Sequence, residues 1–237
     1  MSQPTLETAA EAKDHVAVVG QLGEIMSTPN IATASNEQTA GGRLVPAPFI
    51  IGVGRSGTTL LRTMLAAHPD LAIPLETHFI ARLARKCEQA DNPWDYFLDE
   101  VTSSSRWSQY QIDRALLEER IAAIVPFDLT EALRTFYKLH AERLGKPRWG
   151  DKTPRYVIKM LIIQRVLPEA HFIHIIRDGR DVALSVLEQP WGPATIEEAA
   201  TWWVTSIREG WHQAKAAHAY MEVHYEQLLL ETQSTLQ

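Results

Sequence analysis

One glycine-rich stretch, residues 48–65 (PFIIGVGRSGTTLLRTML), combines the residue types that hold an anion. The apolar run at 49–51 predicts a buried strand, and apolar residues at helical spacing after the glycines predict a helix. Glycines let the backbone fold tightly around an anion, and the free N–H groups at the start of a helix point at it. Thr58 and Thr59 add hydroxyl donors in the first helical turn. The stretch therefore predicts a phosphate cradle.

This cradle differs from a nucleoside-triphosphate loop at one position. Gly52 and Gly57 have the spacing of the G-x-x-x-x-G-K-[ST] motif, but position 58 is Thr where the motif has Lys. The cation comes earlier, at Arg55. Because no lysine is placed to reach the β- and γ-phosphates, the loop is poorly suited to ATP or GTP. It can still hold a shorter anion with one bridging group to activate.

The Arg-Ser-Gly-Thr-Thr-Leu sequence at 55–60 resembles the 5′-phosphosulfate-binding loop of sulfotransferases that use 3′-phosphoadenosine 5′-phosphosulfate (PAPS). Its form is most similar to the tyrosylprotein-sulfotransferase-like and bacterial branches. The resemblance implies that Arg55 contacts both the 5′-phosphate and the bridging oxygen, on which negative charge builds as the sulfuryl group is transferred. The donor-binding residues implied by the loop are Arg55, Ser56, Gly57, Thr58, Thr59 and Leu60.

Glu76 is the predicted general base. It lies 21 positions after Arg55, the separation at which tyrosylprotein sulfotransferases carry a catalytic glutamate followed by threonine. A carboxylate beside a desolvated pocket can have its pKa raised enough to accept an alcohol or phenol proton. The residue after Glu76-Thr77 is His78, where the family commonly has arginine, so His78 is a rival base.

Three further segments extend the resemblance to the rest of the donor. Lys152 resembles the family lysine that contacts the bridging oxygen, where an ammonium would stabilise the departing phosphate. Arg177 and Ser185 match the 3′-phosphate site, and an arginine offers a forked donor suited to phosphate. Tyr225, in a Tyr-Glu-Gln-Leu segment, resembles the tyrosine that lies near the adenine and the 3′-phosphate.

The implied activity is transfer of a sulfuryl group from PAPS to an acceptor hydroxyl, leaving adenosine 3′,5′-bisphosphate. Transfer would be in-line, without a metal, and would use Glu76, Arg55 and Lys152 as catalytic residues. Small molecules, sugars, lipids and tyrosine peptides all remain open as acceptors. Family members continue beyond the Tyr-Glu-Gln-Leu segment with more cofactor contacts, so one alternative is a catalytically impaired PAPS- or nucleotide-binding module. A P-loop kinase is the other alternative, and Thr58 argues against it.

An α/β framework has to position these residues. Strands predicted at 49–51 and 171–176 alternate with helical patterns, which implies a largely parallel sheet. Ligands on such sheets gather at the carboxyl ends of the strands. The cradle, Glu76, Lys152 and Arg177 all follow predicted strands, so we expect them to cluster at one edge. The predicted fold is a P-loop-like three-layer sandwich, with a central sheet flanked by helices.

The other predicted elements are less sharply defined. A second strand is predicted at 71–75, and a helix that Pro154 opens is predicted at 154–166. Residues 91–108 are irregular and aromatic in pattern. Thr195 starts a long predicted helix to about residue 218, because Thr195 and Glu198 have the spacing of a capping box.

Length and composition bound the remaining questions. The 237 residues suggest one α/β domain with an extra arm. The arm and flexible linker are predicted at 1–45, and the resemblance implies that 46–237 form one sulfotransferase domain. A net charge of −6 argues against a nucleic-acid binder. The single cysteine, Cys87, fits a reducing compartment. The sequence also has no signal-peptide pattern and no apolar run of roughly 18 residues, so we expect a cytoplasmic protein without a membrane span.

Overall fold

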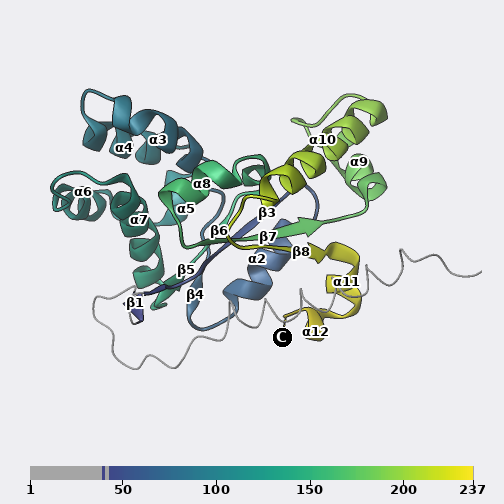
Figure 1. Ribbon diagram of the computed structural model, residues 1–237, viewed down its shortest axis with the longest axis horizontal. Coiled ribbons are helices and arrows are strands. Elements are labelled where there is room, and N and C mark those ends of the chain that lie inside the picture. The colour runs from purple at the N-terminus through teal and green to yellow at the C-terminus, as the bar shows by residue number, and fades with distance from the viewer. Residues whose placement is uncertain (1–38, 41–42, 237) are drawn as a thin grey trace, which may run out of the picture.

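A four-stranded parallel sheet forms the centre of the computed structural model, which describes residues 39–40 and 43–236 (Figure 1). In spatial order its strands are β6 (Asp151–Lys152), β3 (Ala47–Gly52), β7 (Ala170–Ile176) and β8 (Tyr220–His224). Every residue of β3 is buried, as expected for a central strand of a parallel sheet covered on both faces. The predicted parallel sheet and both of its predicted strands are therefore confirmed.

Alternate residues of β3 pack into different cores, which makes the fold a three-layer sandwich. Phe49 and Ile51 join the core formed with α7 (Leu129–Arg143) and α8 (Met160–Val166). Ile50 points the other way, into the core formed with α2 (Thr58–Ala66) and α11 (Tyr225–Leu230). Figure 1 shows these two helical layers on opposite sides of the sheet. This arrangement confirms the predicted P-loop-like α/β fold.

The predicted strand at 71–75 is shorter than expected and lies outside the central sheet. β4 (Leu71–Ala72) pairs in parallel with β5 (Arg148–Trp149). Pro74 follows almost at once, and a proline has no N–H to donate to a strand partner. Lys146 holds the turn before β4, because its Nζ donates to the carbonyl oxygens of Ala66, His68 and Leu71 at 2.6, 3.0 and 3.1 Å.

The interpretation of residues 91–108 as irregular is wrong, because two helices form there: α4 (Pro93–Thr102) and α5 (Trp107–Tyr110). Asn92 caps α4 by accepting hydrogen bonds from the N–H groups of Trp94 and Asp95. Pro93 occupies the first turn, where its missing N–H costs nothing. Around these two helices lie α3 (Ile80–Lys86), the 3-10 helix η1 (Cys87–Gln89) and α6 (Arg114–Ala122).

Two other predicted helices form with altered bounds. The helix predicted at 154–166 is broken at Lys159 into a 3-10 helix, η2 (Pro154–Ile158), and α8. The long helix α10 (Ile196–Ala214) is capped by Thr195 as predicted but ends four residues earlier. Between β7 and α10 lies α9 (Gly179–Leu187), and α12 (Thr232–Leu236) follows α11.

Most of the predicted arm and linker at 1–45 lies outside the described residues. Its described part contains two short antiparallel strands, β1 (Thr39–Ala40) and β2 (Arg43–Leu44). In the part of the chain that the structure describes, no helix combines the length and the apolar character needed to cross a membrane.

A buried histidine on β7 links the sheet to α10. His174 Nδ1 lies 2.8 Å from the Tyr220 hydroxyl, which donates to Glu222 Oε1 at 2.7 Å. Trp211 Nε1 donates to the same carboxylate oxygen at 2.7 Å. Burial, with a smaller contribution from repulsion by His224, lowers the pKa of His174 to about 3. The folded protein therefore keeps this imidazole neutral at mildly acidic pH.

We expect the stability of the protein to fall as the pH drops below about 6.5. Between pH 6.5 and about 3 the unfolded chain binds a proton at position 174 that the folded protein does not. His174 should therefore remove up to about 1.4 kcal/mol of stability for each pH unit. Urea unfolding of the wild type and of His174→Gln at pH 7, 6 and 5 measures this slope.

The difference between the two proteins isolates His174, because the other groups titrate in both. His212→Gln, on the exposed face of α10, is the matched control and should keep the wild-type slope. If stability fell with pH equally steeply in the wild type and in His174→Gln, His174 would not be the cause of the pH dependence.

Candidate active site

The glycine-rich loop joins β3 to α2 and presents groups suited to an anion. Gly57 is the first residue before α2, with a φ of 89° that favours glycine. No side chain caps α2, so its first N–H groups are left to a ligand or to solvent. The Ser56 side chain is fully buried, yet its Oγ has no hydrogen-bond partner among the described residues. A buried hydroxyl without a partner fits a site that an anionic group completes.

The predicted donor-binding residues from distant segments meet at this loop. Arg55 Nε donates to Ser185 Oγ at 3.0 Å, and Arg177 Nη1 donates to the Arg55 carbonyl oxygen at 3.1 Å. The Arg177 guanidinium lies 4.7 Å above the centre of the Tyr225 ring, within cation–π range. That ring packs directly against Gly57. The Nε atom of Arg177 is buried without a hydrogen-bond partner among the described residues, so it too is suited to a phosphate.

Strand order explains why the cationic side chains surround the loop. β3 lies between β6 and β7, and all three strands run in the same direction. Their carboxyl ends carry Lys152, the glycine-rich loop and Arg177 in that order. Lys152 and Arg177 therefore lie on opposite sides of the loop, at the sheet edge where the sequence predicts them. Thr58 is buried in the first turn of α2, Thr59 is exposed and Leu60 is half-buried.

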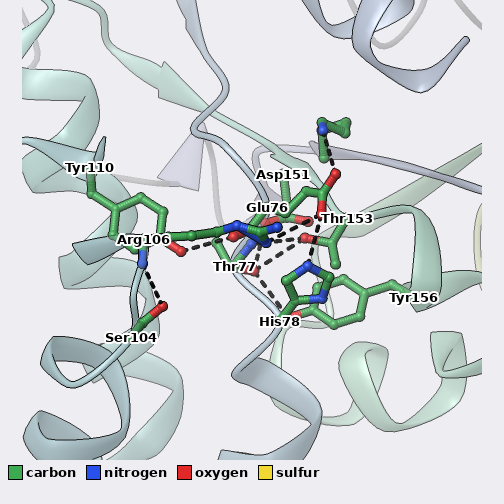
Figure 2. Close-up of polar contacts among 10 residues, drawn as sticks. Glu76, Thr77, His78, Ser104, Arg106, Tyr110, Asp151, Thr153 and Tyr156 are labelled. Carbon is green, nitrogen blue, oxygen red and sulfur yellow. Dashed lines mark hydrogen bonds and ion pairs between the residues drawn. The ribbon is translucent and has the colours of Figure 1, made fainter. Parts of the chain in front are cut away.

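Glu76 is the centre of a second cluster, on the Lys152 side of the loop (Figure 2). Its Oε1 accepts a hydrogen bond from Lys152 Nζ at 2.8 Å. Its Oε2 lies 2.8 Å from His78 Nε2 and accepts from Arg106 Nη1 at 3.3 Å. The Lys152 side chain is only 4% exposed, whereas that of Glu76 is 26% exposed. The carboxylate thus joins a buried ammonium to two more exposed nitrogen groups.

The pKa of Glu76 is lowered, not raised as the sequence suggested. Burial does raise it, but hydrogen bonds with His78 and Lys152 and the charges of Lys152 and Arg106 outweigh burial and lower the pKa to about 2. Glu76 is therefore a carboxylate at neutral pH and, in this arrangement, a weak base. The expectation was wrong because it considered desolvation without these partners.

A buried polar network fixes the backbone next to Glu76 (Figure 2). Asp151 Oδ2 accepts hydrogen bonds from Thr77 Oγ1 at 2.9 Å and from the Tyr137 hydroxyl at 2.8 Å. The N–H of Thr77 donates to Thr153 Oγ1 at 3.0 Å. Asp151 is fully buried; burial raises its pKa to about 6, although the hydrogen bonds from Tyr137 and Thr77 oppose the shift. These contacts give Asp151 a structural role.

Sequence reasoning missed two residues of the site, Arg106 just before α5 and Tyr110 at its end. Arg106 contacts the Glu76 carboxylate, and the Tyr110 hydroxyl donates to the Glu76 carbonyl oxygen at 2.9 Å. Arg106 lies in the segment 91–108 interpreted as irregular, Tyr110 lies just after it, and no motif marks either residue. In residues 39–40 and 43–236, no group of three or more His, Cys, Asp and Glu side chains is placed to hold a metal.

Comparisons with known proteins agree on one family. A model of the sulfotransferase family matches residues 46–237. Protein-tyrosine sulfotransferase 1 of Danio rerio is 28% identical over 218 residues, which are 89% of this chain and 54% of that protein. Protein-tyrosine sulfotransferase of Drosophila melanogaster is 28% identical over 197 residues, 79% of this chain and 36% of that protein. The chain thus spans about half the length of these relatives, or less.

Solved structures with a similar fold include two sulfotransferase domains. The domain from the curacin biosynthetic pathway has a TM-score of 0.55 and 20% identity, over 82% of this chain and 72% of that one. The domain from the Synechococcus PCC 7002 olefin synthase has a TM-score of 0.56 and 21% identity, over 86% and 74%. At this level of sequence identity, the similarity to these two domains shows a shared fold and nothing further.

The contact between Gly57 and Tyr225 generates a prediction. A Cβ atom at position 57 would overlap the Tyr225 ring, and the positive φ adds strain, so Gly57→Ala should destabilise the protein by about 2 kcal/mol or more. Gly145→Ala is the matched control, because Gly145 also has a positive φ but a Cβ there has no neighbour within 4 Å. Urea unfolding measures both. Equal losses in the two variants would mean that backbone strain, and not the ring contact, sets the cost.

Proposed function

The chain belongs to the sulfotransferase family, and on that premise we propose that it transfers a sulfuryl group from PAPS to the hydroxyl group of an acceptor. The observation that carries the proposal is the position of Arg55, which contacts both Ser185 and Arg177. Arg55 belongs to the loop suited to a 5′-phosphosulfate, and Ser185 and Arg177 are suited to a 3′-phosphate. These contacts bring the two sets of groups together at the end of β3. A group that binds the 3′-phosphate distinguishes PAPS from adenosine phosphates that lack it.

Each part of the site has a task in this reaction. Ser56 and the first N–H groups of α2 hold the 5′-phosphosulfate, while Arg177, Ser185 and Tyr225 hold the nucleoside and its 3′-phosphate. The bond between sulfur and the bridging oxygen breaks as a bond forms between sulfur and the acceptor oxygen. The acceptor proton passes to the general base, and adenosine 3′,5′-bisphosphate leaves. Arg55 stabilises the negative charge that develops on the bridging oxygen.

Lys152 connects the donor to the general base. Its ammonium bonds to Glu76, and it lies on the strand next to the loop. When Lys152 turns towards the bridging oxygen, Glu76 loses two of the interactions that lower its pKa, while burial continues to raise it. The carboxylate then becomes a stronger base once the donor is in place. Donor binding and proton acceptance are coupled through one lysine.

Donor recognition is tested by titration calorimetry with adenosine 3′,5′-bisphosphate. We expect binding, with weaker binding of adenosine 5′-monophosphate, because charged hydrogen bonds to the 3′-phosphate are each worth about 1.5–3 kcal/mol. Arg177→Ala should reduce affinity for the bisphosphate by roughly 10- to 100-fold and leave the monophosphate little changed. Arg180→Ala is the control, since that side chain is 89% exposed and pairs with Asp178. Absence of binding at millimolar bisphosphate would exclude the proposal.

The identity of the base is tested by comparing Glu76→Gln with His78→Gln. If Glu76 accepts the proton, Glu76→Gln should lower kcat by about 10²- to 10⁴-fold and His78→Gln by much less. Lys152→Ala should shift the acid limb of the pH profile of kcat/KM to higher pH, because the free enzyme then lacks the ion pair that lowers the pKa of Glu76. A larger loss in His78→Gln than in Glu76→Gln would make His78 the base.

A further inference from the structure

A hollow of about 570 Å³ opens beside the Glu76 cluster, between that cluster and α4. Thr77, His78 and Arg106 form one wall, and two of them contact the Glu76 carboxylate directly. A hydroxyl group bound in this hollow would therefore be next to the proposed base. We call it the acceptor hollow.

A second hollow, of about 690 Å³, adjoins the start of the glycine-rich loop. It is lined by residues of the loop, η2 and α10, including Gly54, Glu197 and Trp202. None of its lining residues contacts Glu76 or Lys152 through a hydrogen bond or ion pair in the described chain. The acceptor hollow is the better candidate for the reacting hydroxyl.

One face of α4 provides the opposite wall of the acceptor hollow. Tyr96, Asp99 and Ser103 follow one another at helical spacing, and all three line the hollow. The following turn adds Ser104 and Ser105. Asp99, Ser103 and Ser105 are exposed, so their oxygens can bond to a bound molecule. This wall offers a carboxylate and several hydroxyl groups within one turn of helix and the turn after it.

The charges of the hollow largely cancel. Arg82 pairs with Glu100 at 2.9 Å, and Arg106 pairs with Glu76. The Asp99 carboxylate is left facing the hollow with hydroxyl groups around it. A wall with so little net charge gives no electrostatic attraction for an acidic peptide, so it favours a neutral molecule. The aromatic residues of the lining are Phe79, which is buried, and Tyr96, which is half-buried and offers one ring face beside the polar groups.

We propose that the acceptor is a neutral polyhydroxylated molecule, a sugar unit, and that Asp99 binds its hydroxyl groups. This inference rests on the sulfuryl-transfer function proposed above. A carboxylate accepts two hydroxyl hydrogen bonds at once, and the serine hydroxyls both donate and accept. A site built on such groups discriminates strongly against analogues without the matching hydroxyls, because its own polar groups would be left unpaired.

The test measures transfer of labelled sulfate from PAPS to three acceptors: a neutral disaccharide, a tyrosine peptide flanked by acidic residues, and a simple phenol. We expect kcat/KM for the disaccharide to exceed the other two by at least about tenfold. A preference for the tyrosine peptide or the phenol would overturn the inference. So would absence of disaccharide labelling by a protein that binds adenosine 3′,5′-bisphosphate. Failure to bind the bisphosphate would instead reject the proposed function itself.

Asp99→Asn tests the recognition step separately. It should raise KM for the disaccharide by roughly 10-fold, the loss of a charged hydrogen bond, while affinity for adenosine 3′,5′-bisphosphate stays unchanged. Asp91→Asn makes the same chemical change at an exposed position outside the hollow and should leave KM as in the wild type. An unchanged KM in Asp99→Asn would also overturn the inference.

Discussion

Parallel pairing of β3 with β6 on one side and with β7 on the other is the constraint on which the site depends. The register places Lys152 opposite Ile50 and Gly52 opposite Ile175, so the strands end close together. Three segments far apart in the sequence thereby deliver a lysine, an anion-binding loop and an arginine to one edge. The fully buried apolar side chains of β3 hold this edge in place, since each face of that strand packs against its own helical layer.

Placing Lys152 at this edge has an electrostatic consequence. Its side chain is almost fully buried, and an unpaired buried ammonium would cost several kcal/mol. Glu76 compensates it, and the buried network of Asp151, Thr77 and Tyr137 holds the backbone from which Glu76 extends. The same carboxylate therefore stabilises the fold and is also the proposed general base. Its low pKa follows from that double role.

Local patterns made much of this architecture predictable. Glycine spacing, apolar periodicity and the capping threonine at 195 each act over a few residues, so they indicate the loop, the strands and α10 directly. Arg106 could not be found in this way, because this residue, just before α5, reaches Glu76 only through the tertiary fold. The Asn92-Pro93 pair is a typical start of a helix, but the aromatic residues after it led to the interpretation of the segment as irregular. The sign of the Glu76 pKa shift depends on partners from three segments, which no local pattern reveals.

The Tyr225 ring, packed on Gly57 and beneath the Arg177 guanidinium, has a consequence for how the protein folds. The glycine-rich loop comes early in the described chain, whereas Tyr225 begins α11, near its other end. Contacts between segments so far apart in sequence form late, because the chain between them must first be ordered. We therefore expect the loop to reach its final form only after β8 and α11 have docked. Donor affinity during refolding would then report the last steps of assembly, after most secondary structure is in place.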